Sequence, residues 1–439
     1  MSPSPRAADL RQPLHRDWLS PPALALALAV ALSAVPARAQ PAAASSAPAS
    51  AASGPTLSAA AGVPLQAAQT AIKAGAYKDA LARLAEAEAL PGLTEYELFI
   101  IQRLKGPALF GAGDPPGAIK AFEASLASPL MAAGDRFALI ETTIKLQVQQ
   151  KDYPRAAALM KGYLADGGPS AEIRRLYPQV LSVMGDHAGV LRELAPVVAA
   201  DDAAKRATPE PTLRMLAASQ SAQKDMVAYV ATLEKLASTT GKSDYLAELI
   251  ARASRRDNFA DERLRLDVYR LRRAAGLALD PGELGDMAYR ALQAGLPAEA
   301  QALLDEGFST GLLGKDANAA ADQKMRDAAT KAATLDRSGL ADGEAAALKA
   351  KDGNAAFNLG LAVSATGAHE RALTLMTQGQ AKGGLRRPDD ALLHLGVAQW
   401  RAGKLDDAQR SFASVQGPDG TADLARLWRV WLGRTQAGK

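Results

Sequence analysis

The sequence contains no cysteine and few aromatic residues. Of its 439 residues none is Cys and only 5% are Phe, Trp or Tyr. The absence of cysteine excludes disulfides, thiol chemistry and lipid attachment at a cysteine that follows a signal peptide. Alternating apolar and polar runs, which half-buried strands require, are missing over any useful length. With its many alanines, the chain is therefore predicted to be all-α and stabilised by helix packing alone.

The sequence has only one long hydrophobic run. It extends over 13 residues from Ala23 to Val35, too short to span a bilayer as a helix. A basic segment precedes it, and Ala37-Arg38-Ala39 has the small-x-small pattern of a cleavage site. We expect residues 1–39 to be a secretory signal peptide cleaved after Ala39, with an uncleaved anchor as the alternative. No membrane span is expected in the mature chain.

The chain carries little net charge. Cleavage would remove four Arg and two Asp, and the net charge would fall from +4 to +2. This balance argues against a nucleic-acid partner. Residues 40–60, rich in Ala, Ser and Pro, offer nothing large and apolar to bury and are expected to be a flexible linker. The signal peptide and the composition predict a periplasmic location.

A four-residue pattern returns five times along the chain. Its members are a small residue, Gly, Ala and a bulky apolar residue, separated by seven, five and four positions. The pattern predicts helical hairpins in which Gly ends the first helix and the small residues allow close helix packing. The five copies are Ala68-Gly75-Ala80-Leu84, Gly106-Gly113-Ala118-Phe122, Ala288-Gly295-Ala300-Leu304, Gly360-Gly367-Ala372-Met376 and Gly396-Gly403-Ala408-Phe412.

The turns inside the hairpins recur at regular distances. They are predicted at Gly75, Gly113, Lys151-Asp152, Gly185-Asp186, Lys224-Asp225, Asp257-Asn258, Gly295, Gly367 and Gly403. The wide gap between the turns at 295 and 367 predicts one further, degenerate hairpin at 316–351, with its break near Ser338-Gly339. The total is about ten antiparallel hairpins, followed by a capping helix in which Trp428 and Trp431 are buried.

The pattern resembles the tetratricopeptide repeat family, most clearly at Leu395-Gly396, Ala408 and Phe412. The Tyr that this family usually has three residues after the first Gly is replaced by Gln399. The resemblance implies a right-handed superhelical solenoid. Its expected parts are N-terminal repeats at 61–174, degenerate repeats at 175–352, C-terminal repeats at 353–420 and the capping helix with its tail at 421–439.

Catalytic and metal-binding patterns were not found. The histidines of the mature chain, His187, His369 and His394, each lack a second ligand at metal spacing. Thr240-Gly241-Lys242-Ser243 resembles the end of a phosphate-binding loop but lacks its first Gly and is interpreted as a turn between helices. We therefore expect no catalytic residue, no metal and no cofactor.

The candidate partner-binding residues follow from the resemblance, because in this family the first helix of each repeat lines an inner groove. On these helices an aromatic residue beside Arg is a typical anchor for a protein partner. Phe357 and Leu393 could equally be ordinary core residues. The candidates are Tyr289, Asn354, Phe357, Leu393, Val397, Trp400 and Arg401.

The segment from Arg252 to Arg273 holds eight arginines. One interpretation is a basic patch for an acidic peptide or an anionic envelope polymer, at Arg252, Arg255, Arg256 and Arg263. The other is a solvated face laced with salt bridges, because Asp261 and Arg265 stand at helical i, i+4 spacing.

Taken together, the sequence predicts a non-enzymatic periplasmic adaptor. It would bind a protein or peptide on a concave surface, in association with complexes of envelope assembly, transport or secretion. Two alternatives remain: a cell-wall enzyme resembling lytic transglycosylases, although the catalytic motif of that class is missing, and a self-assembling structural solenoid.

Overall fold

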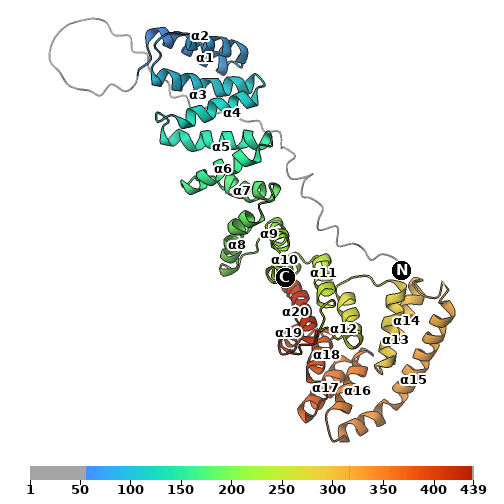
Figure 1. Cartoon of the computed structure of the whole chain (residues 1–439). Coiled ribbons are helices and arrows are strands. Elements are labelled where there is room, and N and C mark those ends of the chain that lie inside the picture. Colours follow the sequence, from blue (N-terminus) through green and yellow to red (C-terminus); the bar gives the residue numbers. More distant parts are fainter. Residues whose placement is uncertain (1–55, 316, 438–439) are drawn as a thin grey trace. The chain divides into compact units, whose positions relative to one another are not determined.

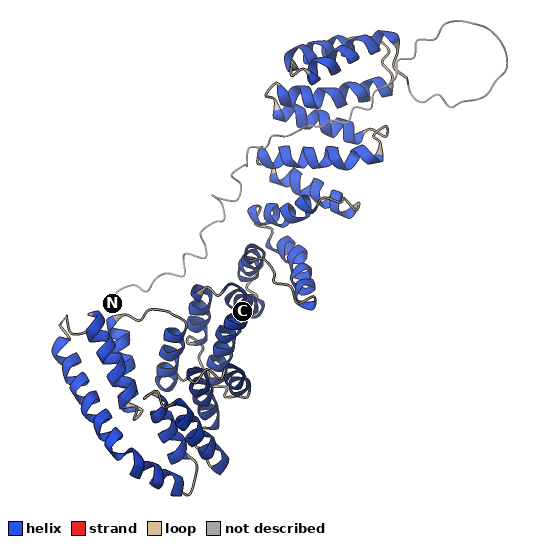
Figure 2. Cartoon of the chain, turned by 180° about the vertical axis from the view of Figure 1, so that it is seen from behind, coloured by secondary structure: helices blue, strands red, loops and turns tan. Residues whose placement is uncertain are grey.

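The computed structural model describes residues 56–315 and 317–437. Within these ranges the chain forms 20 α-helices and no strand (Figure 2). The all-α prediction is therefore confirmed for the described residues. The predicted signal peptide, and the predicted linker up to residue 55, lie outside them. Backbone contacts divide the chain into two compact units, at Val180 and Leu181, so that the boundary falls inside one helix.

The first described helix of unit 1 begins at Ala59, so the last two residues of the predicted linker, 59 and 60, are helical. Its helices are α1 (Ala59–Lys73), α2 (Tyr77–Glu88), α3 (Glu95–Gly111), α4 (Pro115–Ala127), α5 (Ala133–Gln149), α6 (Tyr153–Ala165) and α7 (Ala171–Val183), the last crossing the boundary. A core cluster of this unit lies between α1, α2 and α3 and is built from alanine, leucine and isoleucine side chains. Small residues at these contacts keep the helices close, as the composition predicts.

The described residues of unit 2 form thirteen complete helices after the end of α7. They are α8 (His187–Ala203), α9 (Glu210–Ala222), α10 (Met226–Thr240), α11 (Ser243–Ala253), α12 (Asp261–Ala274), α13 (Pro281–Gln293), α14 (Pro297–Thr310), α15 (Ala319–Lys349), α16 (Asn354–Ser364), α17 (His369–Lys382), α18 (Pro388–Arg401), α19 (Leu405–Ala413) and α20 (Thr421–Ala437). The last helix, α20, packs on α18 and α19 and also on α10, α11 and α12 (Figure 1). It therefore does more than cap the last repeat, because it joins the end of the chain to the middle.

All nine predicted turns lie between consecutive helices. Most have Gly in the left-handed region, as at Gly75, where φ is 74°, and Gly403, where it is 75°. At two turns a lysine takes this conformation: Lys151 has φ 60° and Lys224 has φ 61°. A left-handed residue ends a helix and satisfies its last carbonyl groups, and this local requirement explains why turn positions can be predicted from sequence.

The repeated pattern is explained by contacts inside each hairpin. A Cβ placed on Gly106 would lie 2.1 Å from the ring of Phe122, and one on Gly396 would lie 2.5 Å from the ring of Phe412. The first small residue therefore makes room for the bulky residue of its own hairpin. The other side of Phe412 stacks on Trp428 of α20, with ring centroids 5.6 Å apart. The bulky residue thus joins the two helices of its hairpin to the next helix.

The predicted hairpin at 316–351 is wrong. Residues Ala319–Lys349 form one continuous helix of 31 residues, and Ser338 and Gly339 lie within it without a break. Only four of its side chains are buried, those of Asp322, Ala329, Ala333 and Ala347. The segment has few apolar side chains that a second helix could bury. A hairpin would therefore gain little packing energy over one continuous helix.

A buried carboxylate links the first and third helices of unit 1. Glu97 is 2% exposed and accepts hydrogen bonds from the backbone N–H of Ser58, 2.8 Å away, and of Thr94, 2.9 Å away. The hydroxyl groups of both residues donate to it as well. The hydrogen bond from the Ser58 hydroxyl is the main cause that lowers the pKa of Glu97 from 4.5 to about 2. Glu97 thus closes the capping box of α3 and fixes the start of α1.

We predict that Gly396→Ala destabilises unit 2 by about 1–3 kcal/mol, because the new methyl group overlaps the buried Phe412 ring. Gly433→Ala in α20 is the matched control. Nothing lies within 4 Å of the methyl group it adds, so higher helix propensity predicts no loss, or a gain of up to about 1 kcal/mol. Urea unfolding followed by tryptophan fluorescence measures both, and equal effects would contradict the packing argument.

Glu97→Gln should lower the melting temperature by a few degrees near neutral pH. Both oxygens of Glu97 accept hydrogen bonds from backbone N–H groups, and the NH2 group of Gln cannot accept one. The folded-state pKa is about 2 and the ordinary value is 4.5. The carboxylate therefore stabilises the fold fully above the higher value, and this stabilisation is lost as the pH falls toward the lower one. Thermal circular dichroism against pH should show the two proteins converging on acidification. Glu95→Gln, an exposed change in the same helix turn, should differ little from wild type.

Candidate functional site

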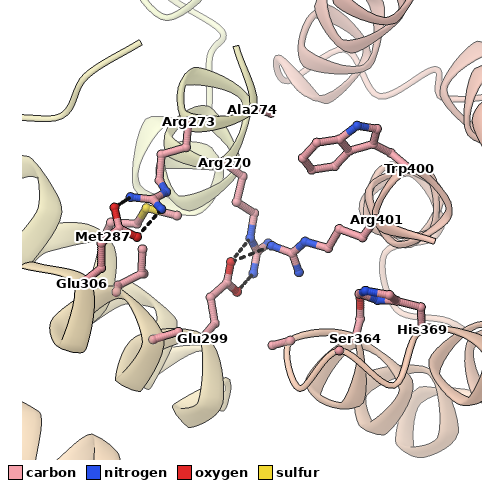
Figure 3. A pocket seen from close by; sticks show the side chains of 14 residues that line it. Arg270, Arg273, Ala274, Met287, Glu299, Glu306, Ser364, His369, Trp400 and Arg401 are labelled. Atoms are coloured by element: carbon pink, nitrogen blue, oxygen red, sulfur yellow. Dashed lines mark hydrogen bonds and ion pairs between the residues drawn. The ribbon is translucent and has the colours of Figure 1, made fainter. Parts of the chain in front are cut away.

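A cleft of about 420 Å³ opens among five segments of unit 2: α12, α13, α14, the turn between α16 and α17 with its flanking residues, and the end of α18 (Figure 3). We call it the Arg401 cleft. Its charged and polar lining residues are Arg270, Arg273, Glu299, Glu306, Ser364, His369 and Arg401, and its other lining residues are Ala274, Met287, Ala302, Leu303, Ala365, Gly367 and Trp400. The volume is in the range of small-molecule binding sites, and the lining combines apolar surface with a few polar groups.

A buried ion pair forms the inner wall of the cleft. Arg270 of α12 donates from Nε to Oε1 of Glu299 at 3.0 Å and from Nη2 to Oε2 at 2.5 Å. Arg401 of α18 donates to the same Oε1 atom at 3.0 Å. Figure 3 shows both guanidinium groups meeting the Glu299 carboxylate, which comes from α14. Three helices are therefore joined at a single carboxylate.

The network continues behind the cleft. Arg270 also donates to Oδ1 of Asp267 at 2.8 Å, and the other oxygen of Asp267 lies 3.1 Å from Nε2 of His394. The side chains of Asp267, Arg270 and Glu299 are at most 8% exposed. Charges this deeply buried are tolerated only when each is paired. The partly buried His394 therefore belongs to this network.

The carboxylates of the network are held ionised. Burial by itself raises the pKa of Glu299, but the charge of Arg270 and then that of Arg401 outweigh burial and lower it from 4.5 to about 2. Burial likewise opposes ionisation of Asp267, whereas His394 and Arg270 hold its pKa well below its usual range. Paired anions of this kind stabilise the fold and do not act as proton donors near neutral pH.

Trp400 joins the cleft to an aromatic cluster. Its ring lies 5.1 Å from that of Trp428 and 5.2 Å from that of Trp431, measured between centroids. Trp428 is fully buried and Trp431 is 6% exposed, so the prediction that this pair is buried is confirmed. Trp18 is the fourth tryptophan and lies outside the described residues. The three described tryptophans thus form one cluster at the edge of the Arg401 cleft.

Some polar atoms that line the cleft have no partner in the described part of the chain. Ser364 is 2% exposed, and its Oγ makes no hydrogen bond; Nδ1 of His369 is buried and makes none. Arg401 has five N–H donors, of which Glu299 receives one. A buried polar atom without a hydrogen bond costs about 1–3 kcal/mol, so Ser364 and His369 hold hydrogen-bonding capacity that the described residues do not use.

The structure brings together only two of the predicted partner-binding residues, Trp400 and Arg401. Phe357 is 4% exposed, Leu393 0% and Val397 3%, so all three are core residues. For Phe357 and Leu393 this agrees with the alternative stated from the sequence, and for Val397 it corrects the assignment to a groove surface. They are buried because α16 and α18 each pack on several neighbouring helices.

The remaining two candidates lie apart from the cleft. Tyr289 is 52% exposed on α13 and is not a lining residue. Asn354 begins α16, donates to the carbonyl of Gly384 at 2.9 Å and accepts from the N–H of Arg386 at 3.1 Å. Asn354 thus fixes the loop before α18 and does not face the cleft.

The predicted basic patch is largely an internal set of ion pairs. Arg252 pairs with Glu248, Arg256 with Asp423, and Arg263 with both Asp390 and Asp419. Of the four predicted patch arginines, only Arg255 is exposed and forms no ion pair with the described residues. The pairs of Arg256 and Arg263 reach α18, α20 and the segment between α19 and α20. They therefore hold α20 in place, and an open cationic surface does not form.

The sequence pattern did not single out Arg270, Glu299, Ser364 or His369. Arg270 looks like one more arginine of a charged helix, and Glu299 stands beside a predicted packing residue, Ala300. Their burial depends in part on α18, whose Arg401 contacts Glu299 over 102 residues of sequence and whose His394 contacts Asp267 over 127. A local sequence pattern cannot predict burial by a helix that is distant in sequence.

In the described residues, no group of three or more His, Cys, Asp or Glu side chains is placed to hold a metal ion. None of the described helices has both the length and the hydropathy needed to cross a membrane. Gly241 and Lys242 form the turn between α10 and α11, where Gly241 has φ 68°, so the interpretation of this segment as a turn is confirmed.

Comparison with known proteins finds no family model that matches the chain and no similar curated protein. The resemblance to tetratricopeptide repeats therefore stays a prediction. The function has to be argued from the Arg401 cleft itself.

Arg270→Met should destabilise unit 2 by about 3–5 kcal/mol, because it leaves Asp267 and Glu299 buried without their shared cation. The matched control is Arg273→Met, which lies about one helical turn further along α12. The pair of Arg273 with Glu306 is partly exposed, so its loss should cost about 0–1 kcal/mol. Urea unfolding distinguishes the two, and equal losses would show that the buried network is not the stronger element.

Proposed function

We propose that this chain is a non-enzymatic helical adaptor that holds a protein or peptide partner at the Arg401 cleft. Its place would be the bacterial periplasm, reached through the signal peptide predicted at residues 1–39, and its task would belong to envelope assembly, transport or secretion. The helical hairpins would form a right-handed, tetratricopeptide-like solenoid of about ten units.

One observation supports this proposal most strongly. The Arg401 cleft has a preformed lining in which an aromatic ring stands beside a cation, and it leaves polar atoms of Ser364, His369 and Arg401 without partners. Trp and Arg are the residues most often found at the energetic centres of protein interfaces. A carboxylate held by two arginines and a buried network behind it keep the lining rigid, so a partner would order little of its host on binding.

A catalytic function has less support. The carboxylates that line the cleft, Glu299 and Glu306, are each paired with arginine. A carboxyl group serves as a general acid or base when its pKa lies near the working pH, whereas that of Glu299 is held at about 2. The groups of the cleft are therefore better suited to binding than to proton transfer.

Photocrosslinking in cells tests the proposal. A photoreactive residue at Ala302, which is exposed and lines the cleft, should capture a defined partner chain that mass spectrometry identifies. The matched control places the same residue at Ala328, an exposed alanine on α15 outside the cleft. We expect the partner from position 302 only. Capture at both positions alike, or at neither, would contradict the assignment of the cleft as the binding surface.

A further inference from the structure

Every buried charge of the Arg401 cleft is paired, yet one region of its wall offers only hydrogen-bond donors and unpartnered atoms. This region consists of the outer N–H groups of Arg401, Oγ of Ser364 and Nδ1 of His369. Figure 3 shows Arg401, Ser364 and His369 on the same side of the cleft, with Trp400 beside Arg401. The Glu299 carboxylate faces the opposite side of the Arg401 guanidinium, where it satisfies one donor.

We propose that the Arg401 cleft binds a carboxylate attached to an apolar group. This inference deepens the proposed function and rests on it for the identity of the carrier, a protein or peptide partner. A single carboxylate has about four acceptor positions. The guanidinium of Arg401 can donate to it in a bidentate manner, the hydroxyl of Ser364 can donate once, and His369 can donate when Nδ1 carries its proton.

The unused hydrogen-bond donors of Arg401 support an anion. Arg270 and Arg273 each hold a carboxylate in a bidentate contact, and Arg270 also donates to Asp267. Arg401 makes a single hydrogen bond, to the Glu299 carboxylate. The three arginines are balanced by Asp267, Glu299 and Glu306, so recognition would depend on the direction of the free Arg401 donors and not on excess positive charge.

The rest of the lining requires an apolar body. Met287, Leu303 and Trp400 line the cleft beside its charged groups, and a cleft of about 420 Å³ accepts a group the size of an amino-acid side chain or a short acyl chain. A small inorganic anion would leave this surface uncovered. The chemistry recognised is therefore a carboxylate with an aliphatic or aromatic neighbour, free or on a peptide.

Titration with small probes tests the inference on the purified protein. Hexanoate carries one carboxylate and an apolar tail, and hexanamide is its neutral counterpart. Because three tryptophans cluster at the edge of the cleft, hexanoate should change tryptophan fluorescence saturably, with a dissociation constant on the order of 1 mM, and hexanamide should not. Calorimetry of the same titration gives an independent readout.

A capped peptide provides the second arm. Acetylated and amidated Leu-Glu-Leu-Leu has its only negative charge on the Glu side chain, and the peptide with Gln in its place has none. Binding of the Glu peptide indicates that a peptide carries the natural carboxylate. Binding of hexanoate without the Glu peptide indicates a free small carboxylate. Both results support the recognised chemistry, whereas no binding by any probe overturns it.

Variants link the binding to the named atoms. Arg401→Gln should weaken hexanoate binding by about tenfold to a hundredfold, the range of a charge-assisted hydrogen bond. Ser364→Ala should weaken it by about twofold to tenfold without loss of stability, because its hydroxyl has no partner to lose. Arg255→Gln, the same charge change at an exposed arginine, should bind as wild type does. Unchanged binding by Arg401→Gln, or equal binding of hexanamide, would overturn the inference.

This inference and the proposed function can fail separately. If hexanoate binds but crosslinking at Ala302 captures no chain, the cleft is a small-molecule site and the adaptor function is wrong. If crosslinking captures one partner, in wild type and in Arg401→Gln alike, and no probe binds, the adaptor function stands and carboxylate recognition is wrong.

Discussion

The buried pair of Arg270 and Glu299 is the interaction on which the rest of unit 2 depends. Moving ions out of water costs several kcal/mol each, and this cost is offset only by complete pairing with good geometry. The bidentate contact, together with Asp267 and Arg401, supplies that pairing. An apolar core of the same shape would stabilise the unit at least as well. What the network adds is position, because α12, α14 and α18 must keep one register for the charges to meet.

The position of Arg401 follows from this constraint. Its guanidinium is held by one contact to Glu299, and its neighbour Trp400 packs against two tryptophans of α20. Helix α20 is held in turn by Arg256 and by the contacts of Arg263 near its start. The donors of the cleft are therefore fixed before any ligand arrives, and a ligand that matches them would lose little binding energy to ordering of the protein.

Local features of the fold could be predicted from the sequence, whereas the cleft could not. Turns at Gly75 or Lys151 depend on one residue in the left-handed region, and the fit of Phe412 against Gly396 is decided within one hairpin. The single helix α15, the return of α20 to α10 and the burial of Leu393 depend on contacts between distant segments. Helical periodicity predicts which side of a helix is buried, but it does not predict which other helix covers that side.

The arginines of residues 252–273 show why this difference bears on function. Their spacing suits a solvated face, but in the structure α18 and α20 cover part of α12, and the charges there become internal contacts. Burial of so many charges leaves a wall whose polar atoms are nearly all paired. Against that background the unpartnered atoms of Ser364 and His369 stand out, because each costs stability that no contact in the described residues returns. A ligand that accepts hydrogen bonds from these atoms would offset that cost. The packing of α18 and α20 on α12 is therefore linked to the chemistry of the cleft.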